Sequence, residues 1–130
     1  MRYIVLLLMA LTLFGSQINW QEDYESALKA AHKTHKPIYV FISAGECPWC
    51  AKFEKYTLSD PSIIKTLNTH YIPLHLVRDF DTIPAKFKQR PVPRHYFLRS
   101  NGAIGWEDIG YVERDLFLSE LQTVLKEINK

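Results

Sequence analysis

The sequence predicts an α/β domain, in which helices cover both faces of a central mixed sheet of about four strands. Two short segments rich in β-branched and aromatic residues, 37–44 and 71–77, have helical patterns between them. Two strands joined through helices should be parallel, with a right-handed crossover. Two later strands, 95–99 and 104–111, flank an Asn-Gly turn at 100–103 that favours a hairpin. These observations together indicate a three-layer α/β sandwich.

Length and composition set the limits of this domain. The chain has 130 residues, of which 47% are hydrophobic and 23% charged, enough for one compact domain with its own core. It has 16 Lys and Arg against 14 Asp and Glu, so its charge gives no reason to expect a nucleic-acid partner.

The N-terminus predicts export. Arg2 precedes an apolar run at 4–14, which small residues follow. This pattern describes a secretory signal peptide at 1–16, cleaved near 15–17, ahead of a domain at 17–130 in the periplasm or outside the cell. An uncleaved anchor is the alternative. The run is shorter than the roughly 20 residues that cross a bilayer, so no stable membrane span is expected after processing.

The elements before the hairpin follow from local signals. An amphipathic helix is expected from residue 20 to about residue 35, ending before Pro37. Asp60 and Pro61 mark the start of the helix that precedes the second strand. That strand contains Pro73, which cannot donate a ladder hydrogen bond, and we therefore place it at an edge or a bulge.

Three further segments complete the chain. Asp81 is expected to cap a short basic helix that runs to about residue 89. A rigid, proline-containing loop at 90–94 leads into the third strand. An amphipathic helix at 113–128 closes the domain after the hairpin.

The segment 45–52 joins the first strand to a helix and contains the chain's two cysteines, Cys47 and Cys50. Cys47 falls at the helix N-terminus, where free backbone N–H groups and the helix dipole favour an anion such as a thiolate. Pro48 suits the first helical position, because its missing N–H would have no partner there. Cys50 lies one turn further on the same face, close enough to form a disulfide with Cys47. The arrangement indicates a low-pKa thiol with a resolving partner.

A redox-active disulfide is a better use of this spacing than a structural one. The loop closed between Cys47 and Cys50 is too small to constrain the unfolded chain much. The pair therefore predicts thiol–disulfide exchange.

With these motifs in place, the chain resembles the thioredoxin superfamily over about residues 20–130, and within it the exported single-domain thioredoxin-like proteins. The resemblance rests on the strand-Cys-Pro-Trp-Cys-helix arrangement, on Val92-Pro93 before the third strand, and on the hairpin with its closing helix. It implies a thioredoxin-like three-layer sandwich.

The resemblance also implies roles for individual residues. Cys47 would be the exposed nucleophile that forms the mixed disulfide, and Cys50 the buried thiol that resolves it. Pro93 would be a cis-proline that faces the disulfide, and Val92 would offer backbone hydrogen bonds to a substrate strand.

Residues next to the motif have two interpretations each. Pro48 and Trp49, between the cysteines, are expected to contact substrate and to tune the reduction potential, although Trp49 can equally serve packing. Thioredoxins have a buried acid six residues before the first cysteine, where this chain has Phe41. Glu46, the nearest acid, is either a proton carrier or a surface charge. Arg94 belongs to a basic stretch that either tunes the cysteine pKa or is simply solvated.

We therefore expect an exported thiol:disulfide oxidoreductase, acting as a reductant or as an isomerase. Its partners would be protein thiols and disulfides, with a membrane-bound or soluble thiol as electron donor. No cofactor is expected beyond the Cys47–Cys50 disulfide, and no metal.

One alternative is a non-catalytic module that binds extended peptides beside Pro93 by strand addition. Another is a metallochaperone that uses the same cysteines, although no second pair has ligand spacing.

Overall fold

A computed structural model describes residues 17–130, so the predicted signal peptide lies outside the described residues. The elements are α1 (Tyr24–Thr34), β1 (Ile38–Ser43), α2 (Pro48–Tyr56), α3 (Pro61–His70), β2 (Ile72–Val77), β3 (Arg94–Leu98), β4 (Ile104–Ile109) and α4 (Arg114–Glu127). Within this part of the chain, none of the helices combines the length and the apolar character that crossing a bilayer requires.

The four strands form one mixed sheet in the order β2-β1-β3-β4. β1 pairs in parallel with β2 and antiparallel with β3, and β3 and β4 form the predicted hairpin. Pro73 lies on the outermost strand, β2, as its missing N–H predicts. The backbone N–H of Gln21 donates to the Pro73 carbonyl at 2.8 Å and covers part of this edge.

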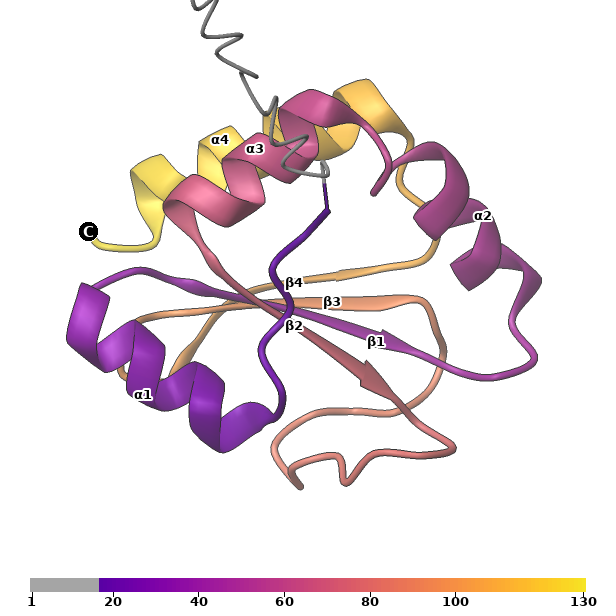
Figure 1. Cartoon of the computed structure of the whole chain (residues 1–130), viewed down its shortest axis with the longest axis horizontal. Helices are drawn as coiled ribbons and strands as arrows, with labels where there is room; N and C mark the ends of the chain where they lie inside the picture. Colours follow the sequence, from indigo (N-terminus) through magenta and orange to yellow (C-terminus); the bar gives the residue numbers. More distant parts are fainter. Residues whose placement is uncertain (1–16) are drawn as a thin grey trace, which may run out of the picture.

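Helices cover both faces of the sheet, as predicted for a three-layer sandwich (Figure 1). α1 lies against one face, and α2, α3 and α4 lie against the other. Successive side chains of a strand point to opposite faces. Tyr39 and Phe41 of β1 therefore pack under α2–α4, whereas Val40 packs under α1.

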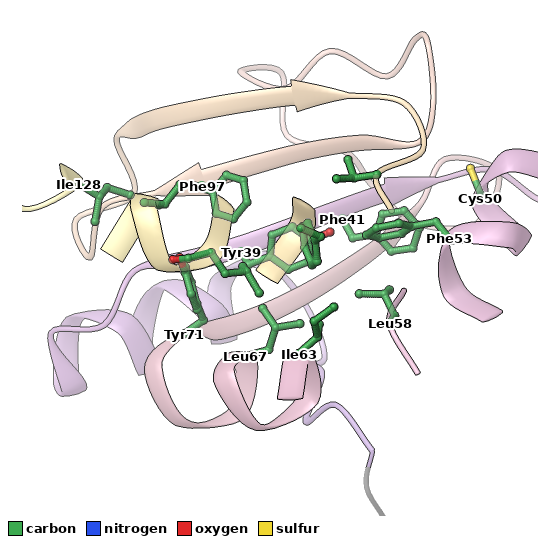
Figure 2. Close-up of a cluster of buried hydrophobic side chains, with 14 residues drawn as sticks. Tyr39, Phe41, Cys50, Phe53, Leu58, Ile63, Leu67, Tyr71, Phe97 and Ile128 are labelled. Carbon is green, nitrogen blue, oxygen red and sulfur yellow. The ribbon is translucent and has the colours of Figure 1, made fainter. Parts of the chain in front are cut away.

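The larger core cluster lies beneath α2, α3 and α4 and includes Cys50 (Figure 2). The rings of Tyr39, Phe41 and Phe53 form its centre, with centroids of Phe41 and Phe53 5.2 Å apart. Burying rings of this size contributes much of the apolar stabilisation of a small domain. The first turns of α2 are thereby fixed on the sheet.

Side-chain caps set the helix starts. Asp60 accepts hydrogen bonds from the backbone N–H groups of Ser62 and Ile63, which confirms its predicted role at the start of α3. Glu113 caps α4 in the same way, through the N–H of Leu116. α1 ends at His35, which has a left-handed φ of 57°.

The prediction of a short helix capped by Asp81 and running to about residue 89 was wrong. The structure has only turns there: the N–H of Phe87 donates to the Pro84 carbonyl at 2.9 Å, and no helix follows. The Phe87 ring is buried against Tyr24 of α1, with centroids 5.5 Å apart. The next N–H, from Lys88, donates to the Tyr96 hydroxyl at 2.9 Å. These long-range contacts override the local helical preference.

Candidate functional site

Cys47 and Cys50 form a disulfide at the first turn of α2, with Cα atoms 5.2 Å apart. Cys47 is the N-cap of the helix, and Pro48 occupies the first helical position, as predicted. The backbone N–H of Cys50 donates to Cys47 Sγ at 3.1 Å. A hydrogen bond of this kind, together with the helix dipole, stabilises a thiolate on Cys47 when the disulfide is reduced.

The two sulfurs differ in exposure. Cys50 is 2% exposed and belongs to the core cluster, whereas Cys47 is only partly buried and packs at the edge of that cluster. An external disulfide can therefore approach Cys47 far more readily than Cys50.

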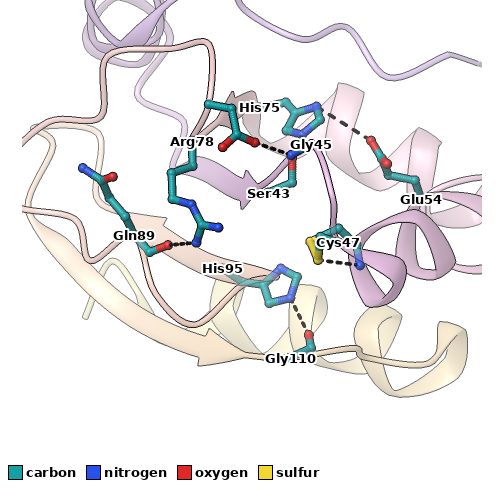
Figure 3. The surroundings of a disulfide bond; sticks show 11 residues. Ser43, Gly45, Cys47, Glu54, His75, Arg78, Gln89, His95 and Gly110 are labelled. Carbon is teal, nitrogen blue, oxygen red and sulfur yellow. Dashed lines mark hydrogen bonds and ion pairs between the residues drawn. A yellow bond between two sulfur atoms is a disulfide. The ribbon is translucent and has the colours of Figure 1, made fainter.

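The turn before Cys47 is held by the segment that follows β2. The Asp79 carboxylate accepts a hydrogen bond from the backbone N–H of Gly45 (Figure 3). A Cβ atom at Gly45 would lie 3.0 Å from Asp79 Oδ2, so a larger residue there would displace the carboxylate by a few tenths of an ångström. Glu46, next in the chain, is exposed and lines a shallow hollow with the 82% exposed Phe80.

Trp49 is both exposed and supported. Its side chain is 56% exposed, and its ring lies 6.0 Å from that of Tyr111, centroid to centroid. The Lys52 ammonium lies 4.9 Å from the Trp49 centroid and 4.7 Å from the Tyr111 centroid. This cation–π arrangement orients the ring without covering it, so the two interpretations of Trp49 are compatible.

The Val92–Pro93 peptide bond is cis, as the resemblance implies, and so is the Arg90–Pro91 bond. The Pro93 carbonyl accepts a hydrogen bond from Gly110 N–H at 2.7 Å, which ties this loop to the end of β4. Val92 packs against the same cluster that contains Cys50. The roles of Val92 and Pro93 in holding a substrate strand stay predictions.

Arg94 has a structural contact of its own. Its register partner in β1 is Ile42, which packs on the α1 face, so the Arg94 side chain lies on the face opposite to α2. Its guanidinium donates to Glu107 at 2.7 Å and to the Arg90 carbonyl at 3.0 Å. Tuning of the cysteine pKa by Arg94 stays a prediction, and the structure gives no direct contact for it.

Two histidines that the sequence analysis did not single out flank Phe41. His75 of β2 and His95 of β3 are both register partners of Phe41. Their rings stack on the Phe41 ring, with centroids 4.5 Å and 5.9 Å away. They are 20 residues apart in sequence, and the register of β2 and β3 on β1 brings them together.

His95 is fully buried and both of its ring nitrogens are engaged. Nδ1 lies 2.8 Å from the Tyr39 hydroxyl, and Nε2 lies 2.9 Å from the Gly110 carbonyl. Since the carbonyl can only accept, Nε2 carries the proton and Nδ1 accepts from Tyr39. Burial lowers the pKa of His95, so this ring is neutral and fixes β3 beneath α2.

His75 has a different environment. Its Nε2 lies 2.7 Å from the Ser43 hydroxyl, and its Nδ1 lies 3.9 Å from a carboxylate oxygen of Glu54 on α2 (Figure 3). Burial lowers the pKa of His75, and the negative charge of Asp81 partly opposes this. Burial also raises the pKa of Glu54.

An α/β sandwich with a disulfide at the start of α2 and a cis-proline directly before β3 defines a protein of the thioredoxin fold. Comparison with known families agrees with this. Residues 19–100 match the family model described as Thioredoxin-like. The chain belongs to this family.

Related proteins share moderate sequence identity with the chain. An uncharacterised protein of Archaeoglobus fulgidus is 27% identical over 92 residues, which cover 68% of this chain and 72% of that protein. Anterior gradient protein 3 of Mus musculus is 24% identical over 109 residues, which cover 84% of this chain and 66% of the mouse protein.

Solved structures show the same fold. A structure titled DsbH Oxidoreductase superposes with a TM-score of 0.73 at 19% identity, covering 85% of this chain and 86% of that one. A thioredoxin from Thermus thermophilus superposes with a TM-score of 0.68 at 22% identity, covering 83% of this chain and 87% of the other.

Proposed function

We propose that the protein is a thiol–disulfide oxidoreductase that exchanges disulfides with protein substrates through Cys47 and Cys50. One observation carries this proposal: the disulfide joins a partly exposed sulfur at a helix N-cap to a buried sulfur one turn later. The resemblance in fold to a structure titled as an oxidoreductase supports the same assignment.

The proposed reaction is a pair of exchange steps. In the reduced protein, the Cys47 thiolate attacks one sulfur of a substrate disulfide, and the other sulfur leaves and takes up a proton. Cys50 then loses its proton and attacks Cys47 Sγ. The Cys47–Cys50 bond forms as the bond between Cys47 and the substrate breaks, and the substrate leaves as a dithiol. Two electrons pass from the protein to the substrate, and the reverse sequence oxidises a dithiol.

The surface around Cys47 is suited to a polypeptide substrate. Trp49 lies two residues after Cys47 and has an exposed aromatic ring, and Pro48 beside it is also exposed. Backbone groups of Val92 offer hydrogen bonds to an extended substrate segment, next to the cis-proline at 93. We propose that these four residues hold the substrate while exchange takes place.

We further propose that the protein works outside the cytoplasm as a reductant or an isomerase, with electrons from a membrane-bound or soluble thiol. The apolar N-terminal segment that predicts a signal peptide supports export. In cell fractions, the mature protein should appear in the exported fraction, and removal of residues 1–16 should retain it in the cytoplasm.

Cysteine variants test the exchange reaction directly. Cys47→Ser should abolish reduction of an insulin disulfide, whereas Cys50→Ser should accumulate a mixed disulfide visible by mass spectrometry without reducing agent. Retained reduction by Cys47→Ser would overturn the proposal. Peptide binding that survives in Cys47→Ser, with no exchange by the wild-type protein, would favour the peptide-binding module. Metal that copurifies with the reduced wild-type protein would favour the metallochaperone.

A further inference from the structure

In the proposed exchange, the buried thiol of Cys50 must lose its proton before it can resolve the mixed disulfide. Cys50 is 2% exposed and lies among apolar side chains, and such surroundings raise the pKa of a thiol. Only its thiolate can attack the mixed disulfide on Cys47. In the sheet beneath this part of α2, Phe41 packs against Phe53 with ring centroids 5.2 Å apart, and its side chain cannot accept a proton.

Two histidines, His75 and His95, lie beside Phe41, and His95 cannot serve as the proton acceptor. Both of its ring nitrogens are already hydrogen bonded inside the protein, one to Tyr39 and one to the Gly110 carbonyl. Accepting a further proton would break the bond from Tyr39 and leave a charge in a fully buried site.

His75 keeps one ring nitrogen available. Nε2 lies 2.7 Å from the Ser43 hydroxyl, and in the tautomer in which Nε2 donates its proton to this oxygen, Nδ1 carries none and can accept one. Nδ1 lies 3.9 Å from a Glu54 carboxylate oxygen, which is too long for a hydrogen bond. The His75 side chain is 20% exposed, so its proton can exchange with solvent.

Glu54 connects this histidine to the helix that carries the disulfide. It lies four residues after Cys50 in α2, and side chains at this spacing lie on the same helix face. Its own side chain is 47% exposed, which opens a route to bulk water. Figure 3 shows Glu54 reaching from α2 towards His75.

We propose that Glu54 and His75 together form the proton acceptor for Cys50, with Ser43 orienting the imidazole ring. The inference rests on the proposed exchange function and adds residues outside the cysteine motif to it. In the resolving step, the Cys50 S–H bond breaks and its proton passes to the Glu54–His75 pair. The Cys50 thiolate then bonds to Cys47 Sγ, and the electron pair of the broken disulfide leaves with the substrate sulfur. The proton is later released to solvent through Glu54.

The electrostatics of the pair support a proton shared between the two groups. Burial lowers the pKa of His75 and raises that of Glu54, so the two values move towards each other. The charged groups that face His75 are Glu54 on α2 and Asp81 after β2, and the negative charge of Asp81 favours a proton on the ring. Its other neighbours, Trp20 and Phe41, are neutral.

A reaction with two visible steps tests the inference. The aromatic disulfide dithiobis(nitrobenzoate) releases one coloured thiolate when Cys47 attacks and a second when Cys50 resolves the mixed disulfide. The measurement is the rate of each release from about pH 5 to pH 9 in the wild-type protein, His75→Gln and Glu54→Gln. The matched controls are His70→Gln and Glu22→Gln, because both side chains are exposed and have no part in the site.

At neutral pH, both test variants should slow the second release by about tenfold or more, given the usual effect of general base catalysis. The first release should stay within about twofold of wild type, and the rates should converge at high pH, where Cys50 ionises without help. A structural defect would instead slow both steps at every pH.

The outcomes separate the inference from the function on which it rests. A second release unchanged in both variants across the pH range would overturn the role of Glu54 and His75 and leave the exchange function intact. If the wild-type protein releases neither thiolate, the exchange function itself is wrong and the inference is lost with it. Because Glu54 is half exposed, its variant should fold even if His75→Gln does not.

Discussion

The carboxylate of Asp79 accepts a hydrogen bond from the backbone N–H of Gly45, two residues before Cys47. Asp79 lies in the turn after β2, at the start of the segment that leads to the cis-proline. One side chain therefore links the turn that carries the nucleophile to the segment that carries Pro93. The position of Cys47 depends on this contact as well as on β1.

Removing the Asp79 carboxylate should loosen the turn before the nucleophile. A hydrogen bond to a charged group contributes roughly 1.5–3 kcal/mol when well shielded, and this one is exposed, so Asp79→Ala should lower the free energy of unfolding by about 1 kcal/mol. Urea unfolding measures this, with Glu22→Ala as the control because Glu22 is exposed and lies outside the helices and strands. Equal stability of the two variants would show that the contact contributes nothing.

The ring of Tyr111 should matter for substrate binding more than its hydroxyl. Tyr111→Leu removes the partner on which Trp49 and Lys52 rest, whereas Tyr111→Phe keeps it. Exposed cation–π contacts contribute about 0.5–1 kcal/mol, so Tyr111→Leu should raise KM for a protein disulfide about two- to fivefold. Steady-state kinetics would contradict this if Leu and Phe at this position gave the same KM.

Breaking the ion pair between Arg94 and Glu107 should be costly. The Arg94 side chain is 3% exposed, and Glu107→Ala would leave its charge buried with only the Arg90 carbonyl and the Tyr96 ring nearby. Loss of one partner of a buried pair costs about 3–5 kcal/mol, and the 37% exposure of Glu107 places the expected loss at the lower end of that range.

Denaturant unfolding measures this loss. A change in the unfolding free energy below about 1 kcal/mol would mean that water solvates Arg94 in the variant. Glu127→Ala is the control, because its partner Lys130 is 70% exposed and such pairs contribute little.

Glu120 should make stability depend on pH near neutrality. Burial, together with the negative charge of Asp108, raises the pKa of Glu120 from 4.5 to about 7. The folded state therefore holds this proton more tightly than the unfolded state. Its contribution to stability is complete below about pH 4.5 and is lost as the pH rises through about 7.

Glu120→Gln cannot ionise and can still accept the hydrogen bond from the Trp106 ring N–H, which is 3.1 Å long in the wild-type protein. Relative to wild type, the variant should gain about 1 kcal/mol between pH 5 and pH 8, a value reduced for solvent screening. Unfolding at both pH values measures the difference. A constant difference between the two proteins would contradict the expectation.

Local signals predicted most of the fold. The apolar segment before the cysteines forms β1, as predicted. Asp60 caps α3 by accepting hydrogen bonds from residues only two and three positions away. Cys47 caps α2 and Pro48 follows it, because both preferences act within one helical turn. Features of this kind depend on neighbours in sequence and can be inferred without tertiary structure.

Features set by distant contacts could not be predicted in the same way. The helix expected before residue 89 is absent because Phe87 is buried against Tyr24, 63 residues earlier. The pairing of His75 with Glu54 requires the parallel register of β1 and β2 and the placement of α2 over that edge. The ion pair between Arg94 and Glu107 likewise depends on the register of the β3–β4 hairpin.

We propose above all that Cys47 and Cys50 cycle between disulfide and dithiol. The most direct test equilibrates residues 17–130 with mixtures of reduced and oxidised glutathione and follows the fluorescence of Trp49, which lies between the two cysteines. Trp20→Phe and Trp106→Phe remove the other two tryptophans. We expect one two-electron transition at a defined glutathione ratio, and Cys47→Ser should abolish it. A fluorescence signal unchanged at every ratio, with the disulfide intact by mass spectrometry, would contradict it.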